Sequence, residues 1–257
     1  MPLSPEEWHN RFSQQAGWTS QLRRYLLDQL TPDGSLRMLE AGCGTGAVLA
    51  EIEGDAASGL YGLDINLDLL RLAGQHVPRA HLTAGDVCRL PFTAGAFDAA
   101  ICHYLLLWVD DPQQAVAEMA RVVGPGGAVI LMAEPDYGGR IDYPHELAVL
   151  GEWQTKSLRI QGANPLIGRR LAGLLSQAGL IQIESGALGG SWKGAPGAHD
   201  LELEWKVLRA DLEQLPGVLP SRQAEIAALE ATDHLAWSRG ERVLFVPTFY
   251  AWGRKPL

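Results

Sequence analysis

Residues 38–49 read MLEAGCGTGAVL, a run of apolar residues that passes through one acid into three alternating glycines and then into a helical pattern. Gly42, Gly44 and Gly46 carry no Cβ, so a ligand can lie directly against the backbone of this turn. Glu40 stands two residues before the first glycine, where the strand ends. The stretch predicts a strand, a loop that binds an adenosine-like ligand, and a helix. A turn without a ligand uses the same glycines, so the motif needs support from the rest of the chain.

That support comes from acids that stand at the ends of the next predicted strands. Asp64 and Asp86 each close a short apolar segment, as Glu40 does. In an open parallel sheet, ligands bind outside the carboxyl ends of the strands, near the point where the strand order reverses. The three acids are therefore expected to face one crevice. The further strands are predicted from residues 60–64, 80–86, 97–108 and 128–135.

In this order the motifs resemble those of the class I S-adenosylmethionine-dependent methyltransferases. The first motif of that family is an acid, any residue and Gly-x-Gly-x-Gly, which residues 40–46 match, and its Gly-Asp after the third strand is matched by Gly85 and Asp86. The resemblance covers residues 36–135 closely and indicates the subgroup that acts on small molecules. It implies an α/β fold, a doubly wound, mostly parallel, Rossmann-like sheet of seven strands with a helical leader and helical lid insertions.

The resemblance also implies S-adenosyl-L-methionine as the cofactor and S-adenosyl-L-homocysteine as the product. Asp64 suits the two ribose hydroxyls, because an ionised carboxylate only accepts hydrogen bonds, and Asp86 would hold the adenine amino group. In the family a helical leader folds over the cofactor, which places Arg11, Trp18 and Thr19 at the border of the pocket. The expected cofactor-binding residues are Glu40, Gly42, Cys43, Gly44, Gly46, Asp64, Ile65, Asp86, Val87, His103, Trp18 and Arg11.

Other functions share parts of this pattern. Residues 42–47 also fit the dinucleotide motif G-x-G-x-x-G/A, so an NAD(P)-dependent oxidoreductase is an alternative, although the match at Asp86 argues against it. Transfer of a different group from the same sulfonium is a second alternative. A catalytically silent scaffold is a third, but no part of the cofactor motif is missing.

The segment after the fifth predicted strand gathers acids, phenols and an arginine behind two glycines, just past a strand end that should face the methyl donor. We expect the acceptor to bind there, and a solvated loop of the same composition is the alternative. The acceptor-binding candidates are Tyr104, Trp108, Asp136, Tyr137, Arg140 and Tyr143.

A methylsulfonium is already activated, so alignment with the acceptor supplies much of the catalysis, equivalent to about 7–11 kcal/mol. A base is required only for an acceptor such as an alcohol or a carbon acid. His103 and Glu134 are the candidates for that base. A histidine packed beside the cofactor is the alternative for His103.

Composition limits the partners. The chain has 257 residues, of which 47% are hydrophobic, and a net charge of −9 without a basic run, so phosphate backbones are repelled and no nucleic-acid substrate is expected. No signal peptide and no apolar run of about 18 residues are present, so we expect no membrane segment. Three cysteines without C-x-x-C spacing indicate a reducing, cytoplasmic compartment, and no metal site is assigned. The expected partner is a small-molecule substrate, and a homodimer stays open.

An α/β chain of this size is commonly one domain, so residues 1–257 are predicted to form a single methyltransferase domain. It would comprise a leader at 1–30, a cofactor-binding half at 36–135, and two insertions at 136–165 and 193–240. Seven of the eight tryptophans lie outside the cofactor half, which predicts an aromatic lid.

Local signals place several elements. The capping box at residues 4–7 begins a leader helix, and an apolar stripe at residues 22–30 predicts a second one. Residues 164–179 are expected to form a helix that ends at a glycine. Residues 242–254 are read as the last, antiparallel strand, with a bulge or a start near Thr248, because Pro247 cannot donate to a ladder.

Overall fold

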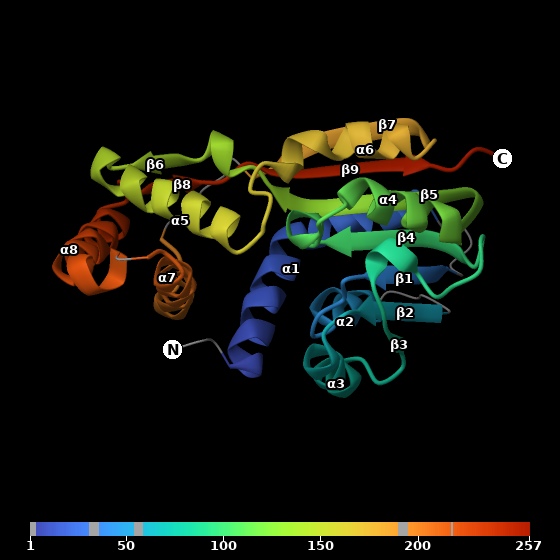
Figure 1. The fold of residues 1–257 in the computed structure, drawn as a ribbon, viewed down its shortest axis with the longest axis horizontal. Coiled ribbons are helices and arrows are strands. Elements are labelled where there is room, and N and C mark those ends of the chain that lie inside the picture. The colour runs from blue at the N-terminus through green and yellow to red at the C-terminus, as the bar shows by residue number, and fades with distance from the viewer. Residues whose placement is uncertain (1–3, 31–35, 54–58, 190–194, 217) are drawn as a thin grey trace.

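The computed structural model describes residues 4–30, 36–53, 59–189, 195–216 and 218–257. A seven-stranded sheet with the order β3-β2-β1-β4-β5-β9-β7 lies at its centre, and its neighbouring strands are parallel except where β9 pairs with β5 and β7. The predicted mostly parallel α/β sheet is thereby confirmed (Figure 1). Its strands are β1 (Arg37–Ala41), β2 (Gly59–Asp64), β3 (His81–Ala84), β4 (Phe97–His103), β5 (Val123–Pro135), β7 (Ile181–Leu188) and β9 (Thr248–Arg254).

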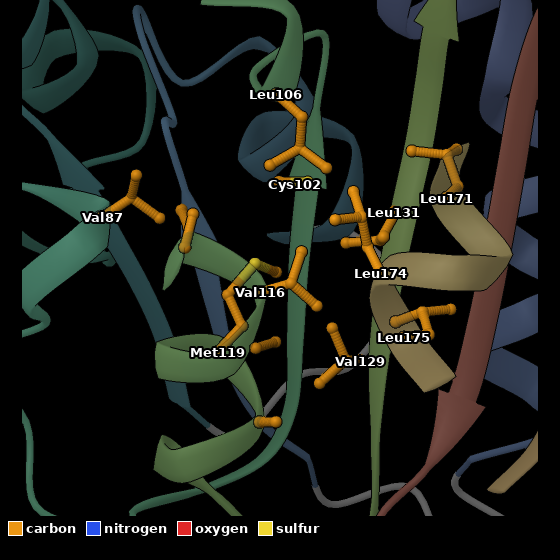
Figure 2. Packing of buried hydrophobic residues seen from close by; sticks show 14 of the residues in the cluster. Val87, Cys102, Leu106, Val116, Met119, Val129, Leu131, Leu171, Leu174 and Leu175 are labelled. Carbon is orange, nitrogen blue, oxygen red and sulfur yellow. The ribbon is translucent and has the colours of Figure 1, made fainter. Parts of the chain in front are cut away.

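Helices cover both faces of this sheet, so the central strands are apolar on both sides. Ile101 and Ile130 face a cluster that includes residues of α1, α2 and α3, while the next residues along each strand, Cys102 and Leu131, face α4 and α6. Figure 2 shows the second face, where side chains of α4 and α6 pack against those of β4 and β5. The helices are α1 (Pro5–Asp28), α2 (Ala47–Glu53), α3 (Leu67–His76), α4 (Pro112–Val122) and α6 (Leu171–Gln177).

The leader is one helix, so the prediction of two was wrong. Its start is confirmed, because Ser4 and Glu7 form the capping box, with N···O distances of 2.9 and 3.2 Å. Gly17 lies within the helix, where a single glycine costs about 1 kcal/mol relative to alanine and does not end a helix that packs against the core. The apolar stripe of the expected second helix is the continuation of α1.

Two other predicted boundaries need correction. The helix expected at 164–179 begins only at Leu171, after a 3-10 turn η5 (Ile167–Arg170), and it ends before Gly179, whose φ is +80°. The expected last strand at 242–254 is two strands in different sheets, since β8 (Val243–Phe245) pairs with β6 (Ile141–Tyr143) and β9 joins the central sheet. The start of β9 at Thr248 agrees with the prediction from Pro247.

Two short strands and three helices form a separate small unit, which we call the cap. Its helices share one apolar cluster that includes Leu150, Trp205, Leu212 and Ile226. In Figure 1 the cap lies beyond one end of the central sheet, and α1 stands between the two. Among the described residues, no helix has the length and apolarity that crossing a bilayer demands. The cap consists of β6, α5 (Ala148–Ile160), α7 (Ala198–Glu213), α8 (Val218–Ser238) and β8.

Candidate active site

The glycine loop joins β1 to α2 in a conformation that suits glycine. The φ angles of Gly42, Gly44 and Gly46 are +73°, +52° and +79°, a region that residues with a Cβ rarely adopt. A Cβ on Gly42 would lie 2.6 Å from Leu105 Cδ1, and one on Gly44 would lie 3.3 Å from Phe12 Cε2. At these glycines the loop is therefore a stretch of backbone without side chains, and Phe12 of α1 packs beside it.

Hydrogen bonds join this loop to the ends of β2 and β3. The amides of Gly42 and Cys43 donate to Leu63 O at 2.7 and 3.0 Å, and the amide of Gly85 donates to Asp64 O at 3.0 Å. The Asp64 carboxylate accepts from the amides of Gly44 and Asn66, each at 2.8 Å. The structure thus brings the first three predicted motifs together at one edge of the sheet, and each oxygen of Asp64 keeps a free lone pair.

Glu40 is buried at the end of β1, and its Oε2 has no hydrogen-bond partner. Burial raises the pKa of Glu40 to about 8, a shift that the positive charge of Arg23 opposes and the charge of Asp64 adds to. A buried, unpartnered carboxylate oxygen costs free energy unless a donor reaches it. The position therefore fits a ligand that carries a cationic donor.

The other predicted cofactor residues differ in exposure. Asp86 is exposed, and one of its oxygens accepts from the amide of Cys88 at 2.8 Å, which leaves the second oxygen for a ligand. Ile65 is exposed beside Asp64, while Cys43 and Val87 are buried in the two core clusters. Burial raises the pKa of the Cys43 thiol, so it stays protonated.

Helix α1 covers the loop from the other side. His9 Nδ1 lies 2.8 Å from Thr45 Oγ1, and Thr19 Oγ1 lies 3.0 Å from His103 Nε2 at the end of β4. Burial, with the charge of Arg23, lowers the pKa of His103 to about 3, so its ring is neutral near pH 7. The sequence reasoning missed His9 and Phe12, since no local motif marks a helix residue that touches the loop from a distance of more than 30 positions.

Glu134 lies at the end of β5, and its carboxylate accepts hydrogen bonds from three successive amides. The donors are Leu105, Leu106 and Leu107, at 2.9, 2.7 and 3.2 Å, so Glu134 caps the 3-10 turn η2 (Leu106–Trp108). Burial raises the pKa of Glu134 to about 7 against the effect of these amides. The geometry gives Glu134 the task of positioning the segment after β4, and it does not line the cavity described next.

A cavity of about 660 Å³ lies between α1, the cap and the carboxyl ends of β4 and β5. Some of its lining residues were predicted from the sequence, and others were not. The lining residues that were predicted from the sequence are Arg11, Trp18, Thr19, Tyr104, Tyr137 and Arg140. The lining residues that sequence reasoning missed include Gln14, Glu204, Asp233 and Arg242, because the packing of the cap, and no local motif, brings them there.

Three nominated acceptor residues lie elsewhere. The side chains of Trp108 and Tyr143 are exposed, with relative exposures of 49% and 57%, and they are not among the lining residues of the cavity. Asp136 is buried and forms a bidentate ion pair with Arg169. The carboxylate of Asp136 is therefore engaged in structure.

Tyr104, directly after β4, has a φ of +52°. An aromatic residue in this region is strained, and such strain is typical of functional positions. The ring is held in the wall of the cavity, and burial raises the pKa of its phenol to about 12. Tyr104 thus stays a neutral hydrogen-bonding group near neutral pH.

A network of buried charges holds the cap side of the cavity. Arg140 Nε donates to Asp142 Oδ2 at 2.6 Å, and Arg242 Nη2 donates to Asp142 Oδ1 at 2.8 Å. Arg242 Nε also donates to Asp233 Oδ1 at 2.6 Å, and Trp205 Nε1 donates to Asp233 Oδ2 at 2.9 Å. Each charge has a partner, so the network fixes β6, β8, α7 and α8 relative to one another.

Comparisons with known proteins agree with this architecture. A family model described as a methyltransferase domain matches residues 39–131. A demethylmenaquinone methyltransferase of Renibacterium salmoninarum is 33% identical over 124 residues, which are 48% of this chain and 52% of the relative. A malonyl-[acyl-carrier protein] O-methyltransferase of Pseudescherichia vulneris is 28% identical over 193 residues, which are 75% of this chain and 68% of the relative. The chain thus spans about half the length of the Renibacterium relative.

A solved structure shares the fold over most of the chain. The [4+2]-cyclase SpnF is 20% identical, with a TM-score of 0.59, and the match covers 93% of this chain and 82% of that one. This likeness concerns the fold alone, and the name of that protein indicates that the fold does not define the reaction. Residues 39–131 therefore match a methyltransferase domain, and the strand order and the glycine loop agree with the resemblance of this part of the chain to the class I S-adenosylmethionine-dependent methyltransferases.

Proposed function

We propose that this protein binds S-adenosyl-L-methionine at the glycine loop and transfers its methyl group to a small molecule held in the cavity under the cap. The observation that carries the proposal is the unpartnered, buried oxygen of Glu40 beside a loop of three glycines with positive φ. A cationic nucleoside fits both features, because it brings donors to Glu40 and needs bare backbone beside it. Residues 1–257 would act as one domain in the cytoplasm, where the free thiols Cys43, Cys88 and Cys102 stay reduced.

The residues divide the work by position. Asp64 would accept from the two ribose hydroxyls, Asp86 from the adenine amino group, and Glu40 from the ammonium of the cofactor. When bound, the cofactor supplies an activated methyl group. Helix α1 and the cap enclose the cavity and exclude water, and its walls align the acceptor with the methyl group, an effect equivalent to about 7–11 kcal/mol.

His103 and Glu134 contribute indirectly in this proposal. His103 is neutral and contacts Thr19 of α1, so it orients the leader against the end of β4. Glu134 accepts hydrogen bonds from the amides of the turn after β4, which sets the position of Tyr104 and Leu105. Neither is assigned as a base, since a ring with a pKa of about 3 is a poor proton acceptor and Glu134 is not among the cavity-lining residues.

The experiment is calorimetric titration of the purified protein with S-adenosyl-L-homocysteine and, separately, with NAD. We expect binding of the nucleoside and none of NAD. Incubation with S-adenosylmethionine labelled in its methyl group and a fractionated metabolite extract should then label a small molecule. Binding of NAD without binding of S-adenosyl-L-homocysteine would overturn the proposal and indicate an oxidoreductase.

A further inference from the structure

The lining of the cavity contains one cationic group, Arg11, that interacts electrostatically with two phenols. Arg11 of α1 has a side chain with only 11% relative exposure, and its charge acts on the hydroxyls of both Tyr104 and Tyr137. Its guanidinium lies 5.2 Å from the centroid of the Trp18 ring. Arg11, Tyr104 and Tyr137 come from α1, the end of β4 and the segment after β5.

Arg11 has unused hydrogen-bond donors. Its Nη1 donates to Gln14 Oε1 at 2.6 Å and to the carboxylate of Glu204, whereas its Nε and Nη2 have no partner among the described residues. The hydroxyl of Tyr137 likewise has no partner in the described part of the chain, although Tyr137 lines the cavity. A guanidinium presents five N–H donors, so Arg11 can take a second anionic partner.

The cavity lining holds three arginines and three carboxylates, and the unused donors of Arg11 favour an anion over an amine beside that residue. Glu204, which pairs with Arg11 from α7, has 34% relative exposure and lies nearer solvent than Arg11 does. The two phenols have raised pKa values, so they remain protonated and can donate. An ammonium placed there would lie against the Arg11 guanidinium and be repelled.

Much of the remaining lining is apolar and aromatic. Trp18, Trp205, Leu208 and Trp237 line the cavity, whose volume of about 660 Å³ is in the range of sites for small organic molecules. Flat rings pack well against tryptophan faces. The lining of the cavity therefore combines aromatic side chains with the hydrogen-bond donors of Arg11, Tyr104 and Tyr137.

We propose that the methyl acceptor is a flat, aromatic molecule with an anionic oxygen, which is held by the guanidinium of Arg11 and the hydroxyls of Tyr104 and Tyr137. The acceptor takes the Nε and Nη2 donors of Arg11 that Glu204 and Gln14 leave unused. This assignment rests on the proposed function, because it takes the cavity to be the acceptor site.

The test uses three probes of one shape: 2-naphthoate, the neutral 2-naphthamide and the cationic 2-naphthylmethylamine. Each is titrated calorimetrically into protein saturated with S-adenosyl-L-homocysteine. We expect 2-naphthoate to bind at least about tenfold more tightly than either of the others.

Variants then locate the anion. Arg11→Met should weaken 2-naphthoate about 10- to 100-fold, and Tyr137→Phe about fivefold, while 2-naphthamide changes little. Glu204→Gln should strengthen 2-naphthoate severalfold, because it removes a negative charge that repels the anion beside Arg11. Glu202→Gln is the matched control, since it removes the same charge from an exposed position of α7 outside this cavity, and it should change nothing.

The outcomes separate this proposal from the proposed function. Preferred binding of the amine, lost in Glu204→Gln, would overturn the anion site. So would the absence of binding by all three probes to protein that binds S-adenosyl-L-homocysteine, and the proposed function would then survive. Failure of the wild-type protein to bind S-adenosyl-L-homocysteine would overturn both. If Arg11→Met does not fold, the opposite effects expected of Glu204→Gln and Tyr137→Phe still decide the assignment.

Discussion

The backbone amide of Gly44 donates a 2.8 Å hydrogen bond to Oδ2 of Asp64, so the glycine loop and the end of β2 form one unit. Asp64→Ala removes this contact and both acceptors that the ribose hydroxyls would use. Calorimetry should show an affinity for S-adenosyl-L-homocysteine at least about 100-fold lower, since hydrogen bonds to charged groups contribute about 1.5–3 kcal/mol each. Asp86→Ala should have a smaller effect. Asp68→Ala, on the exposed side of α3, is the control and should leave the affinity unchanged.

Gly42→Ala should destabilise the fold and block the cofactor. The new Cβ would lie 2.6 Å from Leu105 Cδ1. The alanine would also have to adopt a φ of +73°, a strained conformation that costs about 1–3 kcal/mol. Gly17→Ala is the contrasting variant, because nothing lies within 4 Å of its Cβ in the middle of α1. It should stabilise the protein by about 0.5–1 kcal/mol. Thermal melts of both variants check the signs, and equal melting temperatures would contradict the expected strain at Gly42.

Cofactor binding should release a proton from Glu40. With a pKa of about 8, Glu40 is mostly protonated at pH 7, and a cationic donor on the ligand favours its ionised form. The affinity should therefore rise with pH between 6 and 8, by up to about tenfold per pH unit. The binding enthalpy should differ between phosphate and Tris buffers for the wild type but not for Glu40→Gln. Identical enthalpies in the two buffers for the wild type would argue that Glu40 does not meet the ligand.

His103 should make stability fall on acidification. Its pKa is lowered from 6.5 to about 3 in the folded protein, so the unfolded chain binds the extra proton between these values. The stabilisation is complete above pH 6.5 and is lost as the pH falls toward 3, with a slope of at most about 1.4 kcal/mol per pH unit. Urea unfolding between pH 4 and 7 should give a shallower pH dependence for His103→Asn than for the wild type. Parallel curves would show that His103 titrates normally.

The cofactor half was predictable because its signals are local. The acid, the three glycines and the acids at the ends of β2 and β3 lie within about 50 residues of one another, and each follows a short apolar strand. The start of α1 was equally legible from the Ser4 capping box. These features depend on the nearest neighbours in the chain, which is what a sequence pattern records.

The cap was not predictable in the same way. β6 pairs with β8 although Asp142 and Leu244 are about 100 positions apart, and a three-residue strand carries too little periodicity to reveal its partner. The buried pairing of Asp142 with Arg242 likewise depends on how the cap folds. Glu134 looked like a base because it lies near the end of a strand, and only the path of the turn after the neighbouring strand β4 explains its three amide partners.

The last strand along the described chain occupies an interior place, because β9 pairs with β5 on one side and β7 on the other. During synthesis on the ribosome, the sheet therefore stays open until Thr248–Arg254 emerge from the exit tunnel. Up to that moment β5 and β7 present unpaired edges, which are templates for aggregation. A frameshift or stop codon before Thr248 thus yields a chain whose cofactor motifs are intact but whose strands β5 and β7 lack their shared partner.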